Sequence, residues 1–174
     1  MVMPRNPPHT PASDVNRTSS GDVEFTPSSF TLDSNSININ AAALLSSSTS
    51  TFAIQFPVSG IWSVSWQQRI GAGGIPNSTT VGYSTYIDNH TYNGKQISPL
   101  GTPTNVGNRA AEQDGQYTNA SGTTGGLGIQ NTAIAVQEYK AGDIIAPGAY
   151  CNYSNWATQA AGCKFVATLL KRTA

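Results

Sequence analysis

The stretch Thr51–Ile70, TFAIQFPVSGIWSVSWQQRI, decides the fold class of this chain. Large apolar side chains recur at every second position on either side of its Pro-Val-Ser-Gly corner: Phe52, Ile54 and Phe56, then Trp62, Val64 and Trp66. A period of two belongs to strands that bury one face, whereas a helix would spread these residues around its circumference. The stretch therefore predicts two short strands joined by a tight corner. We interpret its aromatic residues as core rather than as a ligand platform.

The composition is that of a neutral chain with few charges. Of the 174 residues, 38% are hydrophobic and 10% are charged, whereas roughly 25% of residues are charged in an average soluble protein. Ser, Thr, Asn and Gly take up the difference, as they do in extracellular β-proteins and virion components. The formal net charge is zero, which argues against the basic surface of a nucleic-acid-binding protein. Without a long apolar run, we expect neither a nucleic-acid partner nor membrane insertion.

The chain divides into an arm and a head. Residues 1–21 combine prolines with Ser, Thr, Asn and Asp without periodicity, which predicts a flexible Pro-rich arm or tether. Proline also occupies the positions where a signal peptide needs its apolar centre, so we expect no signal peptide. Residues 22–174 hold the strand-like patterns and are expected to form a single domain.

Strands are expected throughout the head, separated by turn signals, of which Asn93-Gly94 is the strongest for a hairpin. In the strand expected at Ile129–Tyr139, we expect Ile134 and Val136 to point inward. We expect the last strand, Lys164–Lys171, to be buried on both faces. The other expected strands lie within Val23–Leu32, at Ser34–Asn40, at Val81–Tyr92 and from Ile144. Without a long amphipathic helix, this spacing predicts an all-β antiparallel sandwich or jelly roll.

Three polar stretches, Gly71–Thr80, Pro99–Gly128 and Tyr150–Gly162, are expected to form loops. The second is long enough to hide a weak strand, for which Gln116–Asn119 is the best candidate. Isolated aromatic residues flanked by amides suit saccharide recognition, because sugar CH faces stack on rings and hydroxyls need amide partners. The alternative is that these aromatic residues pin their loops onto the sandwich. The ligand-binding candidates are Gln116, Tyr117, Asn119, Tyr153 and Trp156.

The two cysteines, Cys151 and Cys163, lie late in the chain with a loop-like segment between them. Their separation favours a local disulfide, which would contribute about 2–3 kcal/mol in the chain-entropy model. Two free buried thiols are the alternative. Without nearby histidines, the pair makes a poor zinc site.

Residue patterns for catalysis are missing from the sequence. Of the two histidines, His9 lies in the arm, and His90, close to the Asn93-Gly94 turn, is best interpreted as a solvated turn residue without a nucleophile-elbow motif nearby. The carboxylates are scattered, and no acid pair is nominated for glycoside hydrolysis. We therefore expect no enzymatic activity, no cofactor and no metal.

Three separated pieces of the head share their pattern with one known family. Phe56–Trp66, FPVSGIWSVSW, is similar to an F-x-x-x-G-x-Y-x-F-x-Y strand, with Trp in place of both tyrosines. Tyr139–Ile144, YKAGDI, is similar to an L-x-x-G-D-x-V turn, and Phe165–Leu170, FVATLL, to a closing F-x-G-x-L-L strand. These patterns belong to the C1q/TNF-like jelly-roll family, which the chain resembles over roughly Val23–Arg172. The resemblance implies a compact homotrimer with its termini at the base, loops displayed at the far end, and binding rather than catalysis.

Together these features favour a non-enzymatic trimeric head of a viral or phage fibre or spike. Such a head would attach to a host cell-surface receptor or glycan, and the N-terminal arm would join it to a larger virion or fibre assembly. The expected location is the virion surface. The alternatives are a secreted or cell-surface C1q-like binding module, a structural capsid or decoration protein, and a β-sandwich carbohydrate hydrolase.

Overall fold

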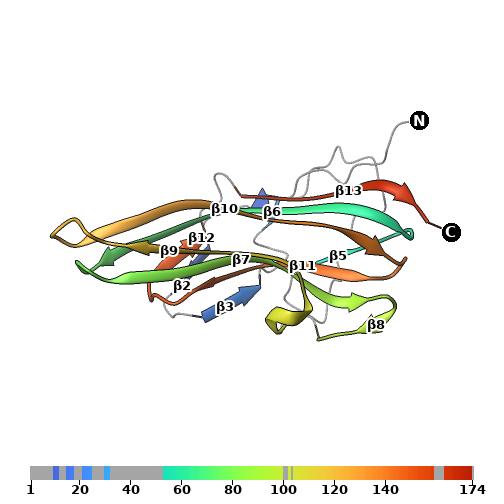
Figure 1. Ribbon diagram of the computed structural model, residues 1–174, viewed down its shortest axis with the longest axis horizontal. Helices are drawn as coiled ribbons and strands as arrows, with labels where there is room; N and C mark the ends of the chain where they lie inside the picture. Colours follow the sequence, from blue (N-terminus) through green and yellow to red (C-terminus); the bar gives the residue numbers. More distant parts are fainter. Residues whose placement is uncertain are drawn as a thin grey trace.

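The protein is described here from a computed structural model, which covers residues 53–99, 102, 104–158 and 163–173 and the four short strands that precede them. Its described residues form strands, turns and one 3₁₀ turn, with no α-helix. Two antiparallel sheets pack face to face in an elongated sandwich (Figure 1). The predicted all-β sandwich is therefore confirmed.

Each sheet is organised around one long strand. In the β6 sheet, the central strand β6 (Gly60–Ile75) pairs with β10 (Gly125–Tyr139) on one edge. Its other edge pairs first with β13 (Lys164–Arg172) and then with β12 (Trp156–Thr158), which in turn pairs with β2 (Val15–Arg17).

In the β7 sheet, β7 (Thr80–Tyr92) pairs with β11 (Ile144–Cys151) on one edge and with β8 and β9 on the other. β11 also pairs with β3 and β5. The strands β1 and β4 pair with each other and belong to neither of the two large sheets. The remaining bounds are β1 (Thr10–Pro11), β3 (Gly21–Glu24), β4 (Phe30–Thr31), β5 (Ile54–Gln55), β8 (Lys95–Gln96), η2 (Val106–Asn108) and β9 (Arg109–Thr118).

The predicted alternation in the second half of Thr51–Ile70 is confirmed. Trp62, Val64 and Trp66 are fully buried between the sheets, while the serines between them face outward. β5 and β6 lie in opposite sheets, so the Pro-Val-Ser-Gly corner is where the chain crosses from one layer to the other. Gly60 is required at the end of this corner, because a Cβ there would lie 2.5 Å from both the Leu169 side chain and the Lys171 carbonyl oxygen.

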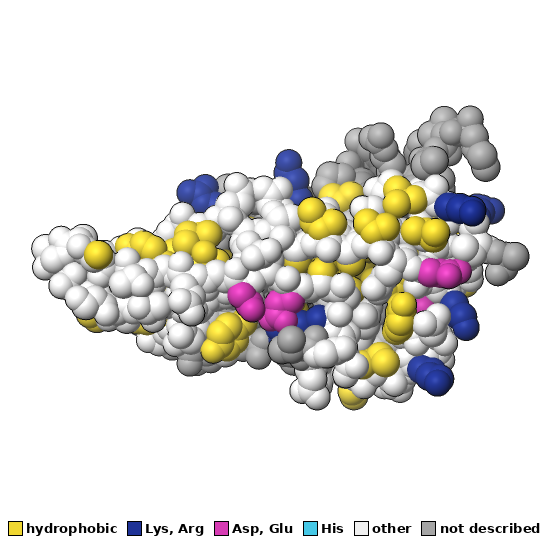
Figure 2. All heavy atoms as spheres, in the orientation of Figure 1, with side chains coloured by type: hydrophobic (Ala, Val, Ile, Leu, Met, Phe, Trp, Pro, Cys, Tyr) yellow, Lys and Arg dark blue, Asp and Glu magenta, His cyan; other side chains and the backbone are white. Residues whose placement is uncertain are grey.

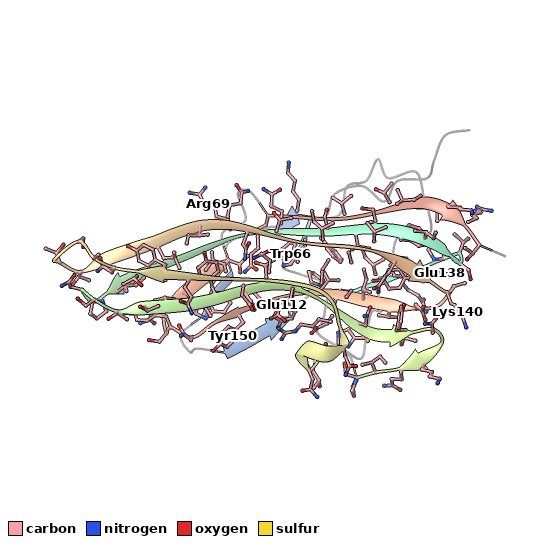
Figure 3. All side chains as sticks on the ribbon, in the orientation of Figure 1. Trp66, Arg69, Glu112, Glu138, Lys140 and Tyr150 are labelled. Atoms are coloured by element: carbon pink, nitrogen blue, oxygen red, sulfur yellow. The ribbon has the colours of Figure 1, made fainter. Side chains whose placement is uncertain are left out.

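Aromatic contacts and buried hydrogen bonds join the two layers. Trp66 lies between the sheets (Figure 3), where its indole Nε1 donates a hydrogen bond to the Gly148 carbonyl oxygen of β11 at 3.0 Å. Phe56, at the corner, stacks on Tyr139 with ring centroids 4.0 Å apart and also contacts Trp62. Buried indoles need such a partner for their N–H group, so this bond fixes the position of β11 over β6.

The prediction of a loop at Gly71–Thr80 is wrong for its first half. β6 continues to Ile75, because Gly71–Gly73 pairs with Gly126–Gly128 of β10. Ladder hydrogen bonds need no side chains, whereas strand predictions depend on side-chain alternation. Glycines facing glycines therefore form a strand that the sequence pattern does not reveal.

The prediction of a loop over Pro99–Gly128 is also wrong in most of its length. The hidden strand proposed at Gln116–Asn119 exists, but β9 runs from Arg109 to Thr118 and β10 begins at Gly125. The Asn93-Gly94 hairpin is confirmed, with φ of 54° and 73° at its two central residues. These values are those of the type I′ turn that Asn-Gly favours.

The predicted orientation of β10 is wrong. Ile134 and Val136 point outward, with 63% and 61% of their surface exposed, and Ala133 and Ala135 point inward instead. The strand register explains why the alanines rather than Ile134 and Val136 face the core, because Ala133 lies opposite Trp66 and Ala135 opposite Val64. A small residue beside each large one fills the core without overpacking.

The last strand is buried on one face rather than on both. Phe165, Ala167 and Leu169 of β13 face the core, while Val166 is partly exposed and Leu170 is 42% exposed.

The predicted arm contains secondary structure. Val15–Arg17 pairs with β12 at the edge of the β6 sheet, and Thr10–Pro11 pairs with Phe30–Thr31. An unpaired sheet edge offers backbone partners to any neighbouring segment, including one without an apolar pattern. The two short strands predicted within Val23–Leu32 correspond to β3 and β4. Phe52 and the strand predicted at Ser34–Asn40 lie outside the described residues.

The predicted disulfide does not form in this structure. Cys151, at the end of β11, and Cys163, just before β13, are both free and fully buried in the core. The Cys163 sulfur accepts a hydrogen bond from the Arg69 backbone N–H at 3.2 Å. Burial raises the pKa of the Cys151 thiol, so it stays protonated and packs as a small hydrophobic residue.

Truncation of Trp66 tests this account of the core. We expect Trp66→Ala to lower the free energy of unfolding by about 3–5 kcal/mol through the cavity that it leaves. Trp66→Phe, which keeps most of the ring but leaves the Gly148 carbonyl without its donor, should cost about 1–3 kcal/mol. Urea unfolding followed by tryptophan fluorescence and circular dichroism measures both. No loss of stability in Trp66→Phe would contradict a role for the indole hydrogen bond, and equal losses in the two variants would contradict the cavity term.

Candidate functional site

Three polar loops from distant parts of the chain meet at one end of the sandwich. We call this end the tip and define it as residues 76–79 between β6 and β7, residues 116–124 from the end of β9 to the start of β10, and residues 152–155 between β11 and β12. It forms the left end of the molecule in Figure 1, opposite the end of β13. The Ser78 N–H donates to the Asn119 carbonyl oxygen at 2.6 Å, which joins the first two loops. The sequence therefore identified the right loop tips, although not their extent.

Asn119 is the residue that holds the tip together. Its amide nitrogen donates to the carbonyl oxygens of Ile75 and Thr123, at 2.8 and 2.7 Å. Its side-chain oxygen accepts two hydrogen bonds from Ser121, one from the backbone N–H and one from the hydroxyl. The side chain is fully buried and its donors and acceptor are all used. The prediction that Asn119 bonds a ligand is therefore wrong, and its role is to position the loops.

Trp156 is also buried. It lies on β12, paired on both edges, and only 1% of it is exposed. Tyr153 is half-buried, and its hydroxyl donates to the Gly74 carbonyl oxygen at 2.8 Å. The alternative interpretation, that loop aromatic residues pin their loops, holds for both.

Gln116 and Tyr117 of β9 keep part of the predicted role. Gln116 is exposed, and Tyr117 is half-buried against the core. Together with the partly exposed ring of Tyr153, they are the predicted ligand-binding residues that a ligand can still reach. The structure does not gather these three into one described pocket.

The tip is uncharged and conformationally strained. Residues 70–87, 115–137 and 144–163 contain no Asp, Glu, Lys or Arg, and the left end in Figure 2 is free of charged side chains. Ser78 and Asn155 have φ of 63° and 57°, a left-handed conformation that costs energy for residues other than glycine. Recognition by this surface would therefore depend on hydrogen bonds and ring contacts rather than on charge.

A buried cluster of charges lies on the outer side of the β7 sheet, where the sequence had indicated none. Asp88 accepts hydrogen bonds from the backbone N–H and the hydroxyl of Thr104, at 3.0 and 2.6 Å, and lies 3.4 Å from the Arg109 guanidinium. Arg109 also pairs with Glu112 and lies over the Tyr86 ring, 3.7 Å from its centre. These contacts hold the segment before β9 against the sheet, so we assign the cluster a structural role.

His90 and Asp143 both lie in the interior of the fold. His90 is buried in β7, where Ser98 contacts its Nδ1, so the prediction of a solvated turn residue is wrong. Asp143 accepts hydrogen bonds from the backbone N–H groups of Asn93, Gly94 and Lys140, which confirms its assignment to turn chemistry. Over the described residues, no group of three or more metal-ligating side chains comes together. Nor does that part of the chain contain a helix with the length and apolar character to cross a membrane.

A second candidate surface lies on the outer side of the β6 sheet. We call it the apolar face, defined by Ile134 and Val136 of β10 and Val166 and Leu170 of β13. Ile134 and Val166 lie on either side of Ser65 in the same row of the sheet. In Figure 2, hydrophobic side chains gather over this part of the molecule, on the right. Exposed apolar residues grouped in this way are characteristic of protein interfaces.

Of the comparisons with known proteins, only the one with solved structures gives a match, and that match concerns the fold. No family model and no curated protein matches the sequence. Among solved structures, the chain is similar to the Eiger TNF of S. frugiperda, with a TM-score of 0.55 and 12% identity. The match covers 98% of this chain and 96% of that one. The chain therefore has a TNF-like jelly-roll fold. At this level of identity, the likeness concerns architecture alone.

Loss of the Asn119 side chain should loosen the tip. Asn119→Ala removes four hydrogen bonds and leaves the Ile75 carbonyl oxygen without this donor, which should cost about 2–4 kcal/mol of stability. The neighbouring exposed change Thr118→Ala serves as the control and should cost less than about 0.5 kcal/mol. Hydrogen exchange should rise in residues 76–79 and 119–124 of the first variant. Unchanged exchange there would mean that Asn119 does not hold the loops.

Proposed function

We propose that this chain is a non-enzymatic binding head that assembles as a homotrimer and attaches to a host surface through its tip. One observation carries the proposal: the same rigid sandwich presents an apolar face on its side and an uncharged polar tip at its end. The first suits contact with identical copies, and the second suits contact with a neutral ligand. Loops displayed on a rigid scaffold are the usual location of binding residues.

The apolar face supplies the argument for assembly. Ile134 and Val136 leave more than half of their surface in water, and full burial of such a side chain is worth about 1.5–3 kcal/mol. A specific interface removes roughly 1,200–2,000 Å² from solvent, an area that the three-stranded surface of β10, β6 and β13 can contribute to. A closed ring of copies satisfies the same face on every subunit. Three is the number that the resemblance to the C1q/TNF-like family implies.

The uncharged tip supplies the argument for a neutral ligand, for which a glycan is the best chemical match. The loops of the tip are rich in Asn, Ser and Thr, and sugar recognition combines such amides and hydroxyls with aromatic rings such as those of Tyr117 and Tyr153. Individual contacts of this kind are weak. A trimer would raise the effective concentration of its second and third tips at a surface that carries many copies of the ligand.

The setting that we favour is the end of a viral or phage fibre or spike, at the virion surface. The low charge of the chain and its Pro-rich N-terminal stretch support this setting, because they fit a neutral head on a tether. The TNF-like fold equally supports a secreted or cell-surface C1q-like module. In such a module the apolar face would again mediate assembly and the tip would again bind the ligand. A capsid decoration protein would need the apolar face but not the tip.

Charge placed on the apolar face should prevent assembly. Ile134→Arg combined with Val136→Asp should convert the trimer into monomers without unfolding them, because both side chains already lie outside the protomer core. Multi-angle light scattering after size exclusion gives the mass, and circular dichroism reports the fold. Thr132→Arg, on the same strand and equally outward, is the matched control. A monomeric parent protein at all concentrations would contradict the proposed assembly.

Changes in the tip should abolish attachment and leave assembly intact. We expect Gln116→Ala combined with Tyr117→Ser to weaken binding to host cells or to a glycan array by at least about tenfold, or about 1.4 kcal/mol. The exposed pair Gln130→Ala and Thr132→Ser on β10 serves as the control. Equal binding by both double variants would move the ligand site away from the tip. No binding by the trimeric parent protein to any host surface would favour the decoration role.

A further inference from the structure

A notch opens in the edge of the β7 sheet, away from the tip. On this edge, β7 pairs with β9 up to Asp88 and with β8 from Thr91. Asn89 and His90 lie between these two partners on the edge of β7. The resulting depression has a volume of about 200 Å³ and reaches across to β10. Its walls include Asn89, Tyr92, Ile97, Asn108, Arg109 and Gln137.

Two side-chain amides, those of Asn89 and Gln137, line the notch. Asn89 is only 7% exposed, and its side chain makes one long contact, with its oxygen 3.5 Å from the Gln137 amide nitrogen. Within the described part of the chain, the Asn89 amide nitrogen donates no hydrogen bond. Because Asn89 lines the notch, this amide nitrogen is accessible there as a donor for a ligand.

Tyr139 lies behind the notch and supports it. Tyr139 is fully buried two residues beyond Gln137 on the same face of β10, and its ring meets Tyr92 edge-on with centroids 5.8 Å apart. Burial raises the pKa of this phenol far above its ordinary value, and its contact with the Gln137 side chain offsets part of that effect. The phenol therefore stays neutral, and its ring holds Tyr92 in the wall of the notch.

The charge around the notch is balanced. Arg109 lies in the wall, but its guanidinium is paired with Asp88 and Glu112. An anion would have to compete with two carboxylates for this cation, and a cation would meet carboxylates that are already neutralised. Tyr92 and the 38% exposed Ile97 provide apolar contact surface beside the amides. This combination selects a neutral ligand with both hydroxyl and CH groups.

We propose that the notch is a binding site for a small neutral polyhydroxylated ligand, about the size of a single monosaccharide unit. Its volume lies below the roughly 300–1,000 Å³ of pockets for drug-sized ligands, which limits the occupant to one sugar ring. The Asn89 and Gln137 amides would bond ring hydroxyls, and the Tyr92 ring would contact a CH face. The site goes beyond the proposed attachment function, since it uses none of the tip residues and does not require it.

The test is a titration of the assembled protein with methyl glycosides of glucose, galactose and N-acetylglucosamine, followed by NMR of the side-chain amides. Glucuronate is the charged comparison. We expect the Asn89 and Gln137 amide signals to shift with at least one neutral sugar and less with glucuronate. Gln137→Met keeps the length of the side chain and removes both hydrogen-bonding atoms. It should weaken binding at least about tenfold, with little change in melting temperature.

Gln116→Met makes the same chemical change at the tip and is the matched control. It should leave sugar binding at the notch unchanged. If sugars shift the tip amides and Gln116→Met alone abolishes binding, the notch proposal is overturned while the attachment proposal stands. If the protein does not attach to host surfaces but sugars still shift the Asn89 and Gln137 signals, the attachment proposal is overturned while the notch proposal stands.

The assembly itself provides the remaining outcome. The notch amides could fail to respond in the trimer yet respond in the monomeric Ile134→Arg, Val136→Asp variant. A neighbouring copy would then fill the notch, and the proposed ligand site would be overturned. The absence of any response in both forms would overturn it as well.

Discussion

The burial of Trp62 and Trp66 of β6 between the sheets is the constraint on which the rest of this structure depends. Trp66 occupies the full depth of the core and bonds the backbone of β11, so the separation of the layers is set by its ring. On one edge β10 presents the small Ala133 opposite Trp66, and on the other edge Phe165 of β13 packs edge-on against the indole. Because successive strand residues face opposite sides, the neighbours Ile134 and Val166 are forced outward. The apolar face is thus a consequence of how the core is packed.

The sequence predicted those elements in which one face is clearly more apolar than the other. β6 and β7 satisfy this condition, as does the Asn93-Gly94 turn, whose geometry is encoded locally. β10 does not, because both of its faces are apolar and the larger side chains, Ile134 and Val136, are those that point outward. Its orientation follows from volume matching against Trp66, which is a contact between distant residues. The glycine strand Gly71–Gly73 and the first part of β9, before Gln116, were missed because few large apolar side chains mark them.

The candidate site shows the same division. Turn-forming residues located the three loops of the tip, but the accessibility of individual side chains depends on long-range pairing. Trp156 is covered because β12 is inserted between β6 and β2. Asn119 is used internally because the β6–β7 turn lies beside it. The notch at Asn89 depends on where β8 and β9 meet the edge of β7, a point that no local pattern encodes.

The two surfaces of the sandwich depend on each other in the proposed function. The charged side chains labelled in Figure 3, Arg69, Glu112, Glu138 and Lys140, lie in the body and at the far end, and the loops of the tip carry none. Without charge, a single tip has no long-range attraction for its ligand and little dependence on salt. Its affinity must come from a few hydrogen bonds and ring contacts, each offset by the loss of water. Only repetition of the tip on a common scaffold makes such contacts sufficient. The outward Ile134 and Val136 thus enable the tip to act, since they are what would hold identical tips side by side.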